Sequence, residues 1–253
     1  MTPAERHERA RRGVEATIDR YSPWVEHGPD FDTADDSDLL ADDRRCRDVS
    51  ISDLIGMQFV VSVDLLAHVH EMVYISESRS VSAPATLLRT AIETAATALW
   101  VVAPDTSDER VARTLRWHHA DYLESATHSF DTGDAMKRAR QEIGDTFRAL
   151  AVEIEIDPDI FGDRLTTTGV LRELESDGQV GLLGTWRLAS GFAHGRPWAH
   201  VAFTDRTDTG IVLPNGSARY RWEPDDNVQG LFLVTVANLV TDLAERWKHI
   251  ATG

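Results

Sequence analysis

Apolar residues recur at helical spacing through most of the chain, so the sequence predicts a mainly α-helical protein. Each expected helix carries its apolar side chains on one stripe, as Val14, Ile18, Tyr21 and Trp24 do in the first helix. A weaker helical pattern covers residues 167–175. The other expected helices cover residues 3–27, about 53–73, 82–102, 107–130, 134–152, 180–194 and about 226–250.

One part of the chain has a different pattern. Trp198 to Phe203, Ile211 to Leu213 and Ala218 to Trp222 are short β-prone runs, and Asn215-Gly216 predicts a two-residue hairpin turn between the last two. The expected fold is therefore a helical bundle with a small antiparallel β-insert, at about 198–222, before the C-terminal helix.

The segment from Asp30 to Asp53 contains nine aspartates and few large apolar residues. Because like charges repel and little apolar surface is available for burial, the segment is expected to be an acidic connecting loop. We assign no chemistry to it. The expected organisation is residues 1–53, with the N-terminal helix and this loop, and residues 54–253, with the bundle, as one compact unit.

The chain has 253 residues and a net charge of −16, from 26 Lys and Arg against 42 Asp and Glu. This acidity argues against unselective binding to DNA or other nucleic acid and against binding to anionic membranes. The single cysteine, Cys46, excludes an internal disulfide, which favours a cytoplasmic location. No apolar run follows the N-terminal arginines, and Leu231 to Val240 falls short of the ~20 residues that span a bilayer. No membrane association is expected.

The informative motif runs from Trp186 to Trp198. Arg187 and His194 are seven residues apart, which on a helix places them about 20° apart in angle and roughly 10 Å apart along the axis, on one face. Ser190 and Gly191 lie between them, and their small side chains leave a groove. Arginine can hold a phosphate and histidine can transfer a proton near neutral pH, so the pair suits metal-free phosphodiester chemistry.

With an arginine, six intervening residues and a histidine near the end of a late helix, the chain resembles the HEPN superfamily of helical-bundle domains. The resemblance implies a metal-independent endoribonuclease of toxin, antiphage or RNA-processing type, without cofactor or metal. It implies RNA as the partner and a homodimer in which two motifs meet, and a toxin role would add a cognate antitoxin. Arg187 and His194 would be catalytic, and Ser190 is expected to donate a hydrogen bond.

The chain departs from the family pattern at Leu188, where members often have a polar residue directly after the arginine. The alternative is therefore a non-catalytic interaction or ligand-binding module. In a purely structural interpretation, Arg187 forms a salt bridge and His194 packs at the end of its helix.

Residues 187–222 contain five arginines against two aspartates, a local charge of +3 before histidines. Aromatic residues are interleaved with these arginines, a combination that suits single-stranded RNA. Arg196, Trp198, Arg219 and Arg221 are therefore candidate substrate-binding residues. The alternative is that the aromatic side chains only pack within the hairpin.

Two further groups have more than one interpretation. Arg89 and Glu93 lie one turn apart on an apolar helix, either as an internal ion pair or as supporting residues that line the same cleft as Arg187 and His194.

A third class of function, a metal-dependent bundle enzyme, would use the remaining histidines as ligands. Their spacing does not match a di-metal bundle site, and no metal is expected. The residues considered for it are His68, His70, Glu71, His118, His119, Asp121, Glu124 and His128.

Overall fold

The computed structural model describes residues 3–76, 80–129 and 133–253. Over these residues it has ten α-helices and one two-stranded antiparallel sheet placed before the last helix, so the expected fold class is confirmed. The helices are α1 (Pro3–His27), α2 (Asp38–Cys46), α3 (Ile51–His70), α4 (Ser82–Val102), α5 (Ser107–Ser129), α6 (Gly133–Glu153), α7 (Thr167–Ser176), α8 (Leu182–Ala193), α9 (Pro197–Phe203) and α10 (Asp226–Thr252). A π-helical turn η1 (Glu71–Ile75) and a 3-10 helix η2 (Pro158–Phe161) complete the helical elements.

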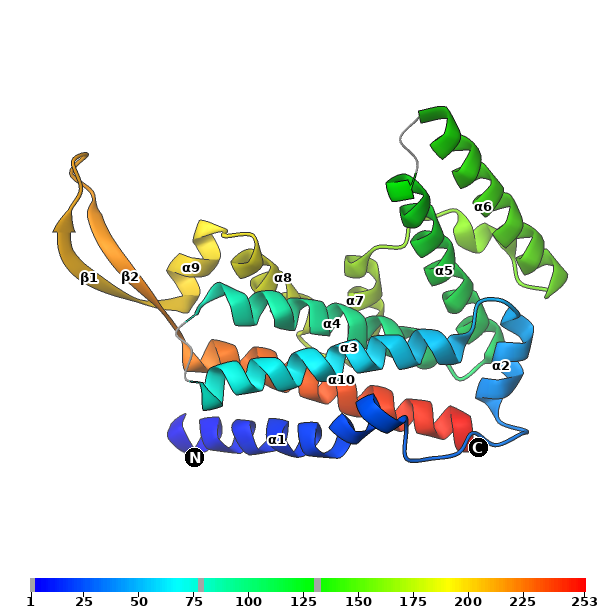
Figure 1. Cartoon of the computed structure of the whole chain (residues 1–253), viewed down its shortest axis with the longest axis horizontal. Coiled ribbons are helices and arrows are strands. Elements are labelled where there is room, and N and C mark those ends of the chain that lie inside the picture. The colour runs from blue at the N-terminus through cyan, green and yellow to red at the C-terminus, as the bar shows by residue number, and fades with distance from the viewer. Residues whose placement is uncertain (1–2, 77–79, 130–132) are drawn as a thin grey trace.

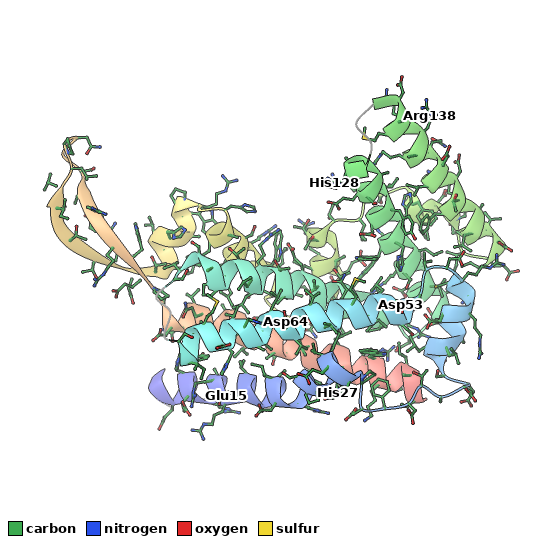
Figure 2. All side chains as sticks on the ribbon, in the orientation of Figure 1. Glu15, His27, Asp53, Asp64, His128 and Arg138 are labelled. Atoms are coloured by element: carbon green, nitrogen blue, oxygen red, sulfur yellow. The ribbon has the colours of Figure 1, made fainter. Side chains whose placement is uncertain are left out.

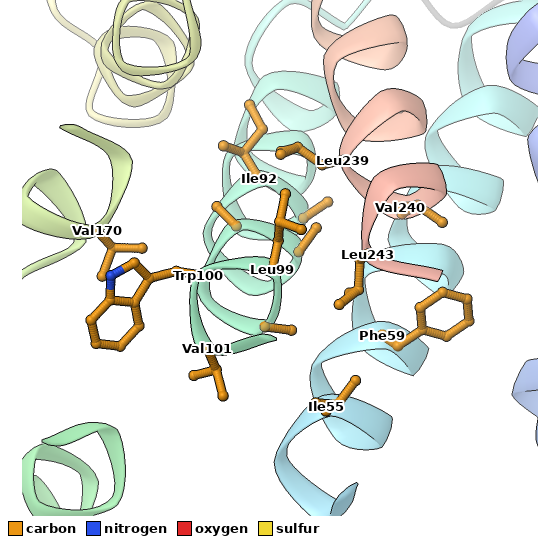
Figure 3. Packing of buried hydrophobic residues seen from close by; sticks show 14 of the residues in the cluster. Ile55, Phe59, Ile92, Leu99, Trp100, Val101, Val170, Leu239, Val240 and Leu243 are labelled. Atoms are coloured by element: carbon orange, nitrogen blue, oxygen red, sulfur yellow. The ribbon is translucent and has the colours of Figure 1, made fainter. Parts of the chain in front are cut away.

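Helix α4 forms the centre of the bundle. It packs against α3 and α10, and α7 and α8 cover its remaining sides (Figure 1). Its alanines allow close helix approach, while larger side chains such as Ile92 and Leu99 interdigitate with Leu239 and Leu243 of α10 (Figure 3). Helix α1 lies along α3 and α10 and contributes Val14, Tyr21 and Trp24 to the same core.

Three segments are long and apolar enough to cross a membrane by length and composition: Ile51–Ile75, Ser82–Val102 and Asp226–Thr252. The expectation that the apolar stretch near the C-terminus is too short to span a bilayer is therefore wrong for α10 as a whole. Helices α3, α4 and α10 pack against one another in the bundle, which buries part of each apolar segment.

Two elements extend from opposite ends of the bundle (Figure 1). At one end α5 and α6 stand side by side, and at the other a hairpin of strands β1 (Thr204–Val212) and β2 (Ala218–Pro224) projects away from the helices. Eight of the nine residues of β1 and three of the seven residues of β2 are solvent-exposed. Helices α8 and α9 lie over α4 beside the base of the hairpin.

The acidic segment is not wholly a loop, because α2 forms within it. The Ser37 side chain accepts a hydrogen bond from the Leu40 backbone amide and caps the helix, and Leu39 and Cys46 are buried against the bundle. The next helix, α3, is capped by Ser50, whose side chain accepts a hydrogen bond from the Asp53 backbone amide.

The β-insert is shorter than expected and begins later. Residues 198–203 lie in α9, and the strands cover 204–212 and 218–224. Five residues, 213–217, connect the strands, where the sequence predicts a two-residue turn: within them the Leu213 amide donates to the Ser217 carbonyl, and Gly216 adopts a φ of 80°, which favours glycine.

Candidate functional site

The motif lies where α8 ends and α9 begins, and its glycine and proline shape this turn. Gly195 has a φ of 61°, the left-handed conformation that ends many helices. Its amide donates to the Phe192 carbonyl over 3.0 Å, and the Arg196 amide donates to the Gly191 carbonyl over 2.8 Å. These two bonds form a Schellman cap. Pro197 then starts α9 at its first position.

The same turn brings α9 into close contact with α8. A Cβ atom placed on Gly191 would lie 2.7 Å from Cζ2 of Trp198 and 2.9 Å from Cβ of Ala199. Only glycine fits this position without movement of α9. The small residues Ser190 and Gly191 of α8 therefore leave room for the Trp198 ring, which packs against Gly191. A groove remains beside this ring.

This groove has a volume of about 310 Å³ and opens onto the surface. It brings together all three expected catalytic residues with Arg196 and Trp198. Trp186 also lines the groove, although the sequence analysis gave it no role. The lining residues are Trp186, Arg187, Ser190, Gly191, His194, Arg196 and Trp198.

Arg187, His194 and Arg196 are exposed. Within the described residues their side chains form no ion pair or hydrogen bond with the protein, and no carboxylate lines the groove. The structural interpretation in which Arg187 forms a salt bridge is therefore wrong for the described part of the chain. Two guanidinium groups and an imidazole next to Ser190 make an opening suited to an anion.

Behind the groove, Glu93 joins α4 to α8. Its carboxylate accepts a 2.8 Å hydrogen bond from Nε1 of Trp186 and lies 2.7 Å from Arg89, whose guanidinium sits 5.5 Å from the Trp186 ring centroid. The expected Arg89–Glu93 ion pair is thus confirmed. Neither residue lines the groove, so the pair does not orient Arg187 or His194. Its connection to the site is Trp186, whose ring it holds in place.

Arg219 and Arg221 lie on β2 and do not line the groove. Arg221 pairs with Glu223 at 3.1 Å. Arg206 of β1 is not among the expected site residues. Its guanidinium lies 4.3 Å from the Tyr220 ring centroid and 5.9 Å from the Trp222 ring centroid. Packing within the hairpin therefore accounts for these two aromatic rings.

The histidines considered for a metal site do not form one cluster of ligands. In the described ranges no group of three or more His, Cys, Asp or Glu side chains could hold a metal ion. His68 lies 3.3 Å from Asp64, and His119 packs against Phe161 with ring centroids 4.8 Å apart.

Burial raises the pKa of the Cys46 thiol to about 12, so this thiol is not poised as a nucleophile.

Comparison with known proteins finds no match: no protein-family model, no curated protein and no solved structure is significantly similar to the chain.

Proposed function

We propose that the protein is a metal-independent endoribonuclease whose active site is the groove at the end of α8. The observation that supports this most directly is the shared groove of Arg187, Ser190 and His194, in which the Arg187 and His194 side chains are exposed and free of partners among the described residues. The resemblance of the Arg187–His194 spacing to the HEPN motif points in the same direction.

The proposed reaction is transesterification within the RNA strand. His194 accepts the proton of a 2′-hydroxyl, the 2′-oxygen forms a bond to the adjacent phosphorus, and the bond from phosphorus to the 5′-oxygen breaks. Arg187 stabilises the negative charge that develops on the phosphate oxygens, and Ser190 donates a hydrogen bond to one of them. Water protonates the leaving 5′-oxygen, and the hydroxide that remains takes the proton from His194, which restores the neutral imidazole. The products carry a 2′,3′-cyclic phosphate and a 5′-hydroxyl.

Single-stranded RNA is the proposed substrate because of the groove's rim. Trp198 is 51% exposed and offers a ring on which a base can stack, and Arg196 is placed to neutralise a neighbouring phosphate. Arg219 on the exposed hairpin can extend this contact along the strand. Such a local cationic surface is compatible with a chain whose overall charge is −16.

A homodimer is part of the proposal, since the groove of one chain opens onto the surface and a second motif would enclose the substrate. The face beside it carries exposed apolar side chains, Val201 at 60% and Phe203 at 38%, which a second copy would cover. A cytoplasmic location is proposed because that is where RNA substrates and reduced cysteine occur together.

The test is cleavage of end-labelled single-stranded RNA by the purified protein in the presence of EDTA. Arg187→Ala and His194→Ala should each slow cleavage by ~10²-fold or more, because each removes a separate contribution to the transition state. Arg172→Ala and His249→Ala are matched controls, since both residues are exposed and neither lines the groove.

Unchanged cleavage in Arg187→Ala and His194→Ala would overturn the proposal. RNA binding without cleavage by the parent protein would favour the alternative of a non-catalytic binding module with the same groove.

A further inference from the structure

A second hollow lies at the other end of the bundle, between α5, α6 and the segment that follows η2. It has a volume of about 580 Å³, within the range of small-molecule sites. Three arginines from three different parts of the chain line it: Arg116 on α5, Arg140 on α6 and Arg164 after η2. Neither the RNA chemistry nor the α8 motif uses these residues.

The charge of this hollow is opposite in sign to that of the chain. Its three guanidinium groups face two lining carboxylates, Glu124 and Asp163, which leaves +1 before histidines in a protein of −16. The pKa of His119, which lines the same hollow, is lowered first by burial and further by the charges of Arg148 and Arg140. The histidine therefore experiences a positive potential in this region.

The arginines have hydrogen-bonding capacity to spare. Nη1 of Arg140 donates to the Leu123 carbonyl over 2.8 Å and to Oγ1 of Thr127 over 3.1 Å, which holds the side chain in place while its other N–H groups stay available. Among the described residues, the Arg164 side chain has no partner and Nε of Arg116 is buried without one. An unpaired buried donor is unfavourable, so an anion would stabilise this arrangement.

Part of the lining of the hollow is apolar. Ile160, Phe161 and Leu165 lie along it, and the His119 ring packs against Phe161. An inorganic anion would contact only the polar part of this lining, whereas a ligand with both a phosphate and a flat apolar part would contact both parts.

We propose that the hollow between α5, α6 and η2 is a binding site for a phosphorylated small molecule of about mononucleotide size. Arg140, held by α5, and Arg164, free to swing, bind the phosphate in bidentate fashion, and Phe161 packs against the organic part. Figure 2 shows His128 near the outer end of α5 and Arg138 on the outer part of α6, which places the site close to the surface.

The test is isothermal titration of the full-length protein with AMP, adenosine and inorganic phosphate as probes. AMP should bind, adenosine should not bind measurably, and inorganic phosphate should bind more weakly than AMP. Arg164→Gln should weaken AMP binding about tenfold or more, since it removes charge-assisted hydrogen bonds without breaking a contact in the described structure. Arg138→Gln is the matched control, an exposed arginine of α6 that does not line the hollow.

Equal binding of adenosine and AMP, no binding of AMP, or equal AMP affinity in Arg164→Gln and Arg138→Gln would overturn the proposal. Equal affinity for phosphate and AMP would overturn the role given to the apolar part of the lining. RNA cleavage measured on Arg164→Gln separates this site from the α8 groove, because the variant should cleave at the parent rate.

Discussion

Nε of Arg110 on α5 donates a 2.6 Å hydrogen bond to Oδ2 of Asp42 on α2, and both side chains are almost completely buried. The other side of the guanidinium donates to the backbone carbonyls of Pro104 and Asp105 at 3.1 and 3.0 Å. Ser107 donates a further hydrogen bond to Asp42. This buried pair therefore fixes α2 against the start of α5.

Asp42→Asn is expected to destabilise the protein by about 1–3 kcal/mol, because the buried Arg110 guanidinium then keeps only one carboxylate partner, the exposed Asp38 at 3.2 Å. Urea unfolding followed by circular dichroism measures the change. Asp48→Asn is the control, since Asp48 is exposed in the same acidic segment and should alter stability little. A loss no greater than that of the control would show that the pair does not hold α2.

The same pair shows why the acidic segment was misread from sequence. Its aspartates suggest repulsion and a loop, and the partner that neutralises Asp42 is 68 residues away, with no local signal. Helical periodicity succeeded for α1, α4, α5 and α10 because each has a long amphipathic pattern. It failed for α2, which has only nine residues, two of which, Asp42 and Asp43, bond outside the helix.

The candidate site was predictable only in part. The Arg187–His194 spacing indicated one helix face, and the structure places both residues on one groove. Trp198 was assigned to a strand because aromatic and β-branched residues follow it, yet Pro197 and the contact with Gly191 place it in α9. Trp186 could have been found from the Arg89–Glu93 pair only if the pairing of α4 with α8 had been known.

Gly191→Ala is expected to separate α9 from α8, because the added Cβ would lie 2.7 Å from the Trp198 ring. The cost should be about 1–3 kcal/mol of stability, with a loss of RNA cleavage as the groove changes shape. Gly184→Ala on the same helix meets nothing within 4 Å and should instead stabilise by about 0.5–1 kcal/mol. Thermal unfolding and RNA cleavage of the two variants, measured in parallel, check the prediction, and similar behaviour of both would contradict it.

Glu93→Ala is expected to lower stability by about 1–3 kcal/mol, since it leaves Nε1 of Trp186 and the guanidinium of Arg89 without their acceptor. Trp186 lines the groove, so RNA affinity should fall as well. Glu93→Gln keeps an acceptor oxygen for Trp186 and should retain more of both properties. Chemical denaturation and RNA titration of the two variants measure this ordering, and the reverse ordering would show that Glu93 does not position Trp186.

Stability is expected to decline as pH falls from 7.5 to 5.5. Burial lowers the pKa of His70, His118 and His119 below the ordinary value of 6.5, with Arg148 and Arg140 adding to the effect at His119. The unfolded chain therefore binds protons at a higher pH than the folded protein, so protonation favours unfolding. Well above pH 6.5 these three histidines are neutral in both states and do not lower the free energy of unfolding. The free energy of unfolding decreases progressively as pH falls below 6.5.

The urea midpoint measured across this range provides the test. His119→Gln should reduce the pH dependence because it removes one of the three histidines, whereas His249→Gln should leave it unchanged, since His249 is exposed on α10. A midpoint that stays constant from pH 7.5 to 5.5 would contradict the prediction. If His249→Gln alone flattened the profile, the pH dependence would come from the surface and not from the buried histidines.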